Sequence, residues 1–229
     1  MSMEKIQSVH ITDEELFRFL KKRSDRDVSF TGVSKSCCVG IVDIVNSTTI
    51  TAKLSSVDMC EYYSVFLNAM SKIVRSYGAT IVKNIGDSLL YYFPNTKDGN
   101  DGFALAEVLD CGLRIIESHE MINLILEESG LPPLDYRISA DYGMISIASS
   151  TSSPNIEDMF GPTVNLCSKL NSAASPNSLV IGGDLHQIVR TLKNYEFTTM
   201  GQCMLGLKLN YPAYFVRRTK SRKWYSYVI

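Results

Sequence analysis

Apolar residues follow two different spacings along this chain, and segments with the two spacings alternate. A continuous apolar run or strict alternation predicts a strand, whereas apolar positions three and four residues apart predict a helix. The pattern predicts helices over 11–23, 56–78, 101–129 (with an interruption) and 161–174. It predicts strands over 37–44, 81–82, 89–93, 193–205 and 212–218, and a strand leading into a short helix over 177–189. Segment 134–149 fits either one strand or a hairpin that turns at Tyr142-Gly143.

The residues at the segment ends suggest how the chain is divided. Thr12 and Glu15 have the spacing of a capping box, which predicts the start of the first helix. The apolar face of this helix is expected to pack on the body or on a partner. Segment 24–36 is interpreted as a linker, and Ser56 and Gly78 as the ends of the second helix. We therefore expect a helix and linker over 1–35, a folded body over 36–216 and a basic, solvated tail over 217–229.

The order of the segments predicts the fold class. Strand, helix, hairpin, helix and strand, followed by further helices and strands, indicate an α+β fold. This is a ferredoxin-like split β-α-β core with a small extra α/β subdomain. In such a sheet the third strand lies between the first two and runs antiparallel to both. The end of the first strand, at Asp43, then lies beside the turn that carries Gly86 and Asp87.

Two carboxylates at one edge of a sheet suggest a specific chemistry. Taken alone, Gly86-Asp87 is an ordinary two-residue hairpin turn with a solvated Asp. Paired with Asp43, it places two negative charges together, which favours cations between them, and hard oxygen ligands favour Mg²⁺ or Mn²⁺. The segment Asn46-Ser47-Thr48 then leads into a helix, where backbone N–H groups suit phosphate oxygens. Together these features indicate two-metal phosphoryl chemistry on a nucleotide.

Composition narrows the classes of protein to which the chain can belong. The chain has 229 residues, 45% of them hydrophobic, which suits a globular protein with a substantial core. A net charge of −1 gives no general case for binding nucleic acid or an anionic membrane. No apolar run reaches transmembrane length, so we expect a cytoplasmic protein. The six cysteines contain no C-x-x-C pair and are interpreted as small core residues, and the three histidines show no zinc-ligand spacing.

Three motifs in order resemble a known family. VGIVDIVNST (39–48), VKNIGDSLLYYF (82–93) and EDMFGPTVNLCSKLNSAA (157–174) together resemble the catalytic domain of class III nucleotidyl cyclases. The resemblance covers about residues 36 to 216, which is the body defined above.

The resemblance implies a role for each matching residue. Asp43 and Asp87 match the two metal-binding aspartates, and the carbonyl of Ile44 would add a ligand. Lys83 and Asp158 match the pair that reads adenine in adenylate cyclases, in which Lys donates to a ring nitrogen and Asp accepts from the amino group. Asn165 matches the residue that orients the ribose.

Two positions depart from the family pattern. Lys169 stands where the family usually has Arg, whose charge stabilises the α-phosphate during transfer. Lys keeps the positive charge but lacks the planar guanidinium group, which can donate two parallel hydrogen bonds. Leu205 stands where the family often has a phosphate-binding Lys, and Lys208 is a candidate substitute.

The resemblance therefore implies an adenylate cyclase. It would convert ATP to 3′,5′-cyclic AMP and pyrophosphate with two Mg²⁺ or Mn²⁺ ions. In the family one subunit supplies the aspartates and the other supplies the remaining site residues. This chain carries both sets, which implies a homodimer. The alternatives are a cyclase for GTP or a pyrimidine nucleotide, and a nucleotide-binding regulatory module with a degenerate site.

Overall fold

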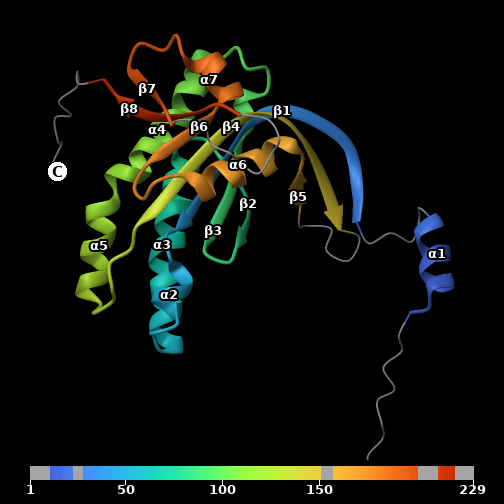
Figure 1. Ribbon diagram of the computed structural model, residues 1–229, viewed down its shortest axis with the longest axis horizontal. Helices are drawn as coiled ribbons and strands as arrows, with labels where there is room; N and C mark the ends of the chain where they lie inside the picture. The colour runs from blue at the N-terminus through green and yellow to red at the C-terminus, as the bar shows by residue number, and fades with distance from the viewer. Residues whose placement is uncertain (1–10, 23–27, 151–156, 201–210, 220–229) are drawn as a thin grey trace, which may run out of the picture.

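The computed structural model describes residues 11–22, 28–150, 157–200 and 211–219 (Figure 1). The helices are α1 (Asp13–Lys21), α2 (Ser47–Thr51), α3 (Ser56–Ser76), the 3₁₀ helix η2 (Pro94–Thr96), α4 (Gly102–Glu117), α5 (His119–Glu128), α6 (Pro162–Ala173) and α7 (Gly183–Val189). The strands are β1 (Val28–Ile44), β2 (Thr80–Ile85), β3 (Ser88–Phe93), β4 (Tyr136–Ser150), β5 (Glu157–Phe160), β6 (Leu179–Gly182), β7 (Tyr195–Thr199) and β8 (Ala213–Arg218). Among the described residues, no helix combines the length and apolarity needed to cross a membrane.

One sheet contains all the strands. Its order is β2-β3-β1-β4-β6-β8-β7, and β5 pairs with β4 beside this path. β3 lies between β1 and β2 and is antiparallel to both, and β1 is antiparallel to β4. The split β-α-β arrangement predicted from the segment order is therefore confirmed, with β6, α7, β7 and β8 as the extra α/β part.

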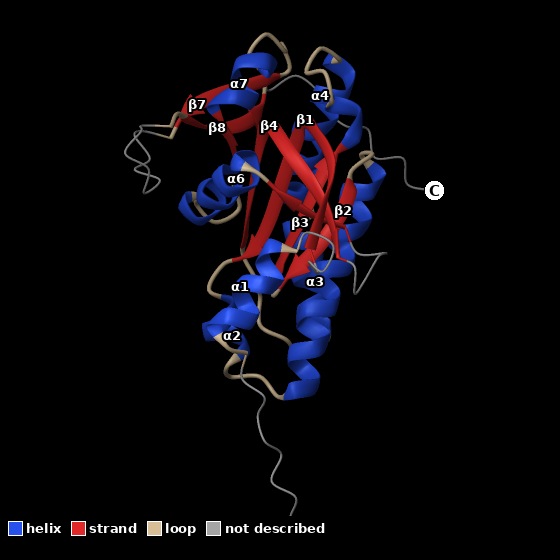
Figure 2. Cartoon of the chain, turned by 90° about the vertical axis from the view of Figure 1, so that its right-hand side faces the viewer, coloured by secondary structure: helices blue, strands red, loops and turns tan. Residues whose placement is uncertain are grey.

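The sheet is covered by helices on both faces. Figure 2 shows α6 on one side of the strands and α3 on the other. Neighbouring residues of β1 point to opposite faces, as the pleat of a strand requires. Cys38, Val42 and Ile44 belong to the main core beneath α3, α4 and α5. Val39 and Ile41 belong to a second core on the α6 face.

Local sequence accounts for the ends of the helices. The capping box of α1 is present, because the Thr12 hydroxyl accepts from the Glu15 N–H and the Glu15 carboxylate accepts from the Thr12 N–H. The cap of α3 is Ser55, one residue before the expected Ser56, and the chain beyond this helix turns at Gly78 with φ of +77°. The expected interruption of the 101–129 helix occurs at Ser118, which separates α4 from α5.

Several expectations are corrected by the structure. The linker interpretation is wrong from Val28 onward, because β1 begins there and pairs with β4. For segment 134–149 the structure decides between the two alternatives, because it forms one strand. The first helix, α1, buries none of its residues in this chain. Cys60 is exposed, unlike Cys37, Cys38, Cys111 and Cys167, which are buried as expected; Cys203 lies outside the described residues.

The expectation of a solvated basic tail over 217–229 is also wrong at the start of that segment. Arg218 belongs to β8, and its guanidinium bonds to the carboxylates of Asp110 (2.6 Å) and Glu117 (3.3 Å). It therefore ties the last strand to α4 instead of standing in solvent. The tail beyond residue 219 lies outside the described part of the chain.

Candidate active site

The pairing of β1, β2 and β3 brings the two aspartates together. Val42 is opposite Leu89 in the sheet, so Asp43 follows at the end of β1 as β3 begins. The hairpin before β3 turns through Gly86 and Asp87, and Gly86 has a φ of +63°, which glycine adopts without strain. The Ser88 hydroxyl donates to Asp43 Oδ1 at 2.6 Å. The end of β1 and the Gly86-Asp87 turn therefore lie side by side, as predicted.

The environment of Asp87 disfavours its negative charge. Burial raises the pKa of this carboxyl, and the nearby charge of Asp43 raises it further. A hydrogen bond from the Ser47 side chain partly offsets both effects. A pair of close, partly desolvated carboxylates of this kind is stabilised when positive charge lies between them.

Arg137 is a site residue that the sequence analysis missed. It lies opposite Asp43 in the β1–β4 pairing, and its Nη2 donates to Asp43 Oδ2 at 3.1 Å. Its Nη1 donates to the carbonyl of Ser172 at 3.1 Å, and its buried Nε has no partner among the described residues. An arginine inside an apolar strand was the available signal, but only the pairing register shows which residue it faces.

Of the three residues expected to take part in the site after β1, one has a side chain that affects an aspartate. Asn46 adopts a left-handed conformation (φ of +57°) and caps α2, which is only five residues long. Ser47 lies near Asp87, and its side chain lowers the pKa of that carboxyl. The side chains of Asn46 and Thr48 are exposed, so only their location beside the aspartates is established.

Lys83 and Asp158 form an ion pair, with 2.5 Å between Nζ and Oδ2. An irregularity in β2 directs Lys83 toward this partner. Ile81 is opposite Tyr91 and Lys83 is opposite Leu90, so Val82 is an extra residue in the pairing. Such a bulge re-aims the following side chain and places Lys83 on the face of the second core, to which Leu90 belongs.

Asn165 and Lys169 lie one helical turn apart on α6. Asn165 is exposed and Lys169 is half-buried. Neither side chain makes a hydrogen bond or ion pair with another residue in the part of the chain that the structure describes. One chain therefore brings Asp43 to Asp87, and Lys83 to Asp158, but joins neither pair to Asn165 or Lys169. Leu205 and Lys208 lie outside the described residues.

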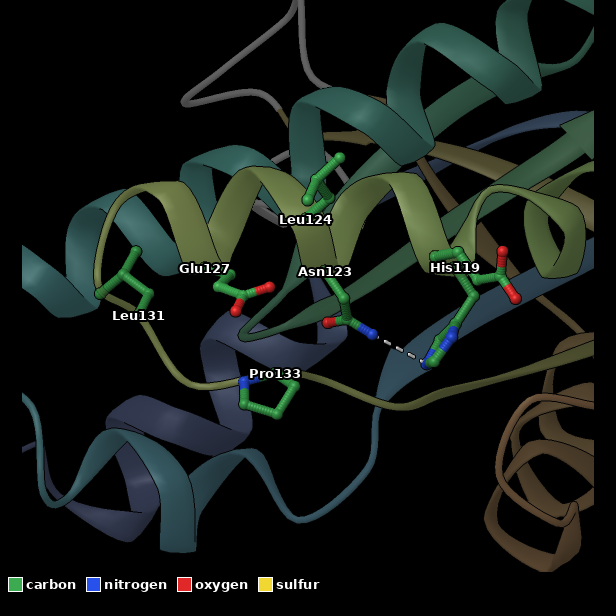
Figure 3. A pocket seen from close by; sticks show the side chains of 7 residues that line it. His119, Asn123, Leu124, Glu127, Leu131 and Pro133 are labelled. Carbon is green, nitrogen blue, oxygen red and sulfur yellow. Dashed lines mark hydrogen bonds between the residues drawn. The ribbon is translucent and has the colours of Figure 1, made fainter.

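A separate pocket lies between α5 and the segment that leads into β4 (Figure 3). Asn123 binds the backbone of Leu134 through both ends of its amide, and His119 contacts Asn123 and Asp135. These bonds hold the start of β4. None of the residues proposed for nucleotide binding lines this pocket.

Two carboxylates suit divalent metals that bind together with a phosphorylated substrate. Among the described residues, no group of three or more His, Cys, Asp and Glu side chains surrounds a possible metal position. Mg²⁺ typically takes one or two carboxylates and completes its shell with substrate phosphates and water. Asp43 and Asp87 fit that requirement without a third acidic ligand.

Comparison with known proteins identifies the family. Residues 32–218 match the adenylate and guanylate cyclase catalytic domain. An adenylate cyclase of Streptomyces coelicolor is 26% identical over 149 residues, which are 65% of this chain and 33% of that protein. The soluble guanylate cyclase gcy-31 of Caenorhabditis elegans is 24% identical over 185 residues, which are 76% of this chain and 25% of that protein. The chain thus spans about a third or less of these relatives.

The fold agrees with that match. The crystal structure of the adenylyl cyclase CyaB from P. aeruginosa superposes with a TM-score of 0.74 at 20% identity, covering 86% of this chain and 98% of that one. The family match covers well over half of the sequence and includes every site residue described above. The chain belongs to the adenylate and guanylate cyclase catalytic domain family, the class III nucleotidyl cyclases.

Proposed function

We propose that this protein is an adenylate cyclase that converts ATP to 3′,5′-cyclic AMP and pyrophosphate. The observation that carries the choice of ATP is the Lys83–Asp158 ion pair. It places a donor beside an acceptor, which matches a ring nitrogen and the amino group of adenine. Guanine presents the opposite order of donor and acceptor, so buried polar groups would be left unpaired, which discriminates strongly.

Asp43, Asp87 and the carbonyl of Ile44 would hold two Mg²⁺ or Mn²⁺ ions. When bound, such ions activate the attacking 3′ oxygen and neutralise charge on the triphosphate. The raised pKa of Asp87 supports this assignment, because the folded chain keeps two carboxylates where a cation would relieve their repulsion.

The chain's own groups account for the rest of the reaction. Lys83 and Asp158 hold the base, and Asn165 orients the ribose so that its 3′ hydroxyl faces the α-phosphorus. Lys169 stabilises the negative charge that develops on the α-phosphate. The guanidinium of Arg137, already beside Asp43, adds positive charge near the triphosphate. The N–H groups of Asn46-Ser47-Thr48, which lie beside the aspartates, would bind the same phosphates.

We propose that the active protein is a homodimer with two equivalent sites. Asn165 and Lys169 have no partner within the described part of the chain, and this favours a second chain that supplies the aspartates they act with. A two-fold axis creates two such sites, because each chain gives its aspartates to one and its α6 residues to the other. We place this activity in the cytoplasm, the compartment that supplies ATP.

Two other interpretations of the protein's function have specific support. The similarity to a guanylate cyclase of Caenorhabditis elegans favours GTP as the alternative substrate. Lys169, in place of the family's usual Arg, favours a slow enzyme or a nucleotide-binding module without turnover. A cyclase for a pyrimidine nucleotide is the remaining alternative, and the Lys83–Asp158 pair opposes it.

One experiment separates these functions. The purified protein is incubated with ATP, GTP, CTP or UTP and either Mg²⁺ or Mn²⁺, and the products are separated by chromatography. Cyclic AMP and pyrophosphate in equal amounts, with ATP preferred, are expected. A preference for another nucleotide would reassign the substrate, and binding without product would indicate a regulatory module.

A further inference from the structure

Helix α6, which carries Asn165 and Lys169, is attached to the sheet by polar side chains. Thr163, Cys167 and Asn171 are spaced four residues apart and therefore lie along one face of the helix. All three are buried, with at most 4% exposed. A helix usually packs on a sheet through apolar residues, so a buried polar row needs a reason.

Each member of the row bonds to a strand. The Thr163 hydroxyl donates to the carbonyl of Met144 at 3.0 Å. The Cys167 thiol donates to the carbonyl of Val39 at 3.5 Å. The Asn171 amide donates to the carbonyl of Ile41 at 3.1 Å. The helix is thus bonded to β1 and β4 along most of its length.

Two further bonds strengthen the attachment on the β4 side. Asn171 Nδ2 also donates to the carbonyl of Arg137 at 3.1 Å, so one amide joins both strands. The Ser139 hydroxyl donates back to the carbonyl of Cys167 at 2.9 Å. Every side chain in this row has a partner.

The start of the helix fits closely against β4. A Cβ at Gly143 would lie 2.6 Å from the Thr163 hydroxyl, and a Cβ at Gly161 would lie 2.8 Å from the carbonyl of Met144. Both glycines therefore permit an approach that a side chain would prevent. The same contact brings Thr163 within bonding distance of β4.

Hydrogen bonds depend on direction, so they can fix the position of a helix on a sheet where apolar contacts alone would allow it to shift. Apolar cores tolerate repacking, whereas a fully satisfied polar network selects one arrangement. A rotation of α6 or a slide along its axis would break the row at several points. The strands that receive these bonds also carry the charged site: Ile41 is two residues before Asp43, and Arg137 binds Asp43 directly.

We propose that Thr163, Cys167 and Asn171 are positioning residues, which fix Asn165 and Lys169 relative to β1 and β4 of their own chain. The proposal rests on the cyclase activity proposed above. Both chains of the proposed homodimer are built on the same strands, so a shift of α6 in one chain displaces Lys169 from the phosphate it serves. Loss of these bonds should therefore reduce stabilisation of the transition state more than it weakens the binding of ATP in the ground state.

The test compares Asn171→Leu with a matched control. Leu has the same number of side-chain heavy atoms and the same branching at Cγ as Asn, and it removes both donors. In Asn171→Leu we expect kcat to fall about tenfold or more, since displacements near 1 Å can cost about a hundredfold. The KM for ATP should change little. The control is Thr96→Val, because Thr96 is equally buried and bonds to Phe93 and Cys38, away from α6.

The control separates positioning from stability. Thr96→Val should lower the melting temperature without changing the kcat of the folded protein. A normal kcat in folded Asn171→Leu, or an equal loss of kcat in Thr96→Val, would overturn the proposal. A wild-type protein that forms no cyclic nucleotide would instead overturn the proposed function itself.

A second pair of variants covers a failure of Asn171→Leu to fold. Thr163→Ser keeps the hydroxyl that bonds to Met144, whereas Thr163→Val removes it with little change in shape. We expect Thr163→Ser to keep its kcat and Thr163→Val to lose it at unchanged KM. Equal kcat in these two variants would overturn the proposal.

Discussion

At the residue scale, the two aspartates have different surroundings although they lie together. Asp43 is bonded on both oxygens, by Ser88 and by Arg137. Asp87 has its pKa raised by burial and by the charge of Asp43. Removing either charge should abolish the chemistry, but only the change at Asp43 should lower the stability of the fold.

Asp43→Asn and Asp87→Asn should each lower cyclase activity by orders of magnitude, because a neutral amide is a weak ligand for a divalent ion. Asp43→Asn should also lower stability by about 1–3 kcal/mol, since it removes a charge-assisted bond to Arg137. Asp87→Asn should leave stability unchanged or raise it. Turnover assays with ATP and Mg²⁺ and urea unfolding measure both effects. Near-normal turnover in either variant would contradict the metal assignment.

The base preference should depend on the Lys83–Asp158 pair. Replacing Lys83→Glu and Asp158→Ser together should weaken selection of ATP and raise relative use of GTP, because the donor and acceptor are exchanged. Lys83→Glu alone is the control; it leaves two carboxylates facing each other and should lower use of both nucleotides. The ratio of kcat/KM for ATP and GTP is the measurement. A double variant with full ATP preference would show that other residues read the base.

Asp141 should make stability depend on pH. Burial raises its pKa from 3.8 to about 6, although Tyr211 and the N–H groups of Tyr142 and Leu185 donate to it. The folded chain therefore takes up this proton at a higher pH than the unfolded chain does. Through this group, stability should rise as pH falls from about 7 to about 4.

Comparison with Asp141→Asn isolates the effect of this carboxyl. The free energy of unfolding of both proteins is measured from pH 7 to pH 4. The difference between wild type and Asp141→Asn should shift toward the wild type on acidification. A constant difference across this range would mean that Asp141 titrates equally in the folded and unfolded chains.

At the element scale, α1 is set apart from the other helices. Its capping box stabilises it locally, but it buries none of its residues in a single chain. Figure 1 shows it away from the sheet. A helix of nine residues is marginal in water without tertiary packing, so an additional surface is expected to cover its apolar face.

Deleting residues 1–22 should therefore leave the body folded and alter dimer affinity or rate. The deletion must end before Val28, because β1 begins there. Circular dichroism and the melting temperature should remain close to those of the full chain. Sedimentation and kinetics provide the readout. If both are unchanged by the truncation, α1 has no part in assembly or activity.

At the scale of the whole molecule, one chain carries two sets of candidate site residues that do not contact each other. Asp43 and Asp87 lie together, whereas Asn165 and Lys169 lack partners within the described part of the chain. The proposed symmetric homodimer would complete both sites, and this arrangement has a quantitative consequence when two defective chains are mixed.

Asp87→Asn and Asn165→Ala should each be nearly inactive alone, because both sites of either dimer are damaged. In the mixed dimer, one site receives both substitutions and the other receives neither. Random exchange should restore about one quarter of wild-type activity. Pull-down with two tags confirms exchange and serves as the control. Confirmed exchange without recovered activity would contradict sites shared between two chains.

The sequence by itself determined the order of the elements and the residue types of the site. Hydrophobic spacing predicted the strands other than β5, the interrupted 101–129 helix and the split β-α-β core, because local patterns record which face of each element is buried. That topology was enough to place Asp43 beside Asp87. The resemblance of three motifs to the cyclase family then suggested roles for Lys83, Asp158, Asn165 and Lys169.

The tertiary structure alone decided which residues face each other. Arg137 lies opposite Asp43 only through the register of β1 and β4, and Lys83 meets Asp158 through an extra residue in β2. The strand character of Val28 and its neighbours also comes from pairing with a distant segment. Local sequence does not encode such contacts, because they arise from hydrogen bonds between segments that are remote along the chain.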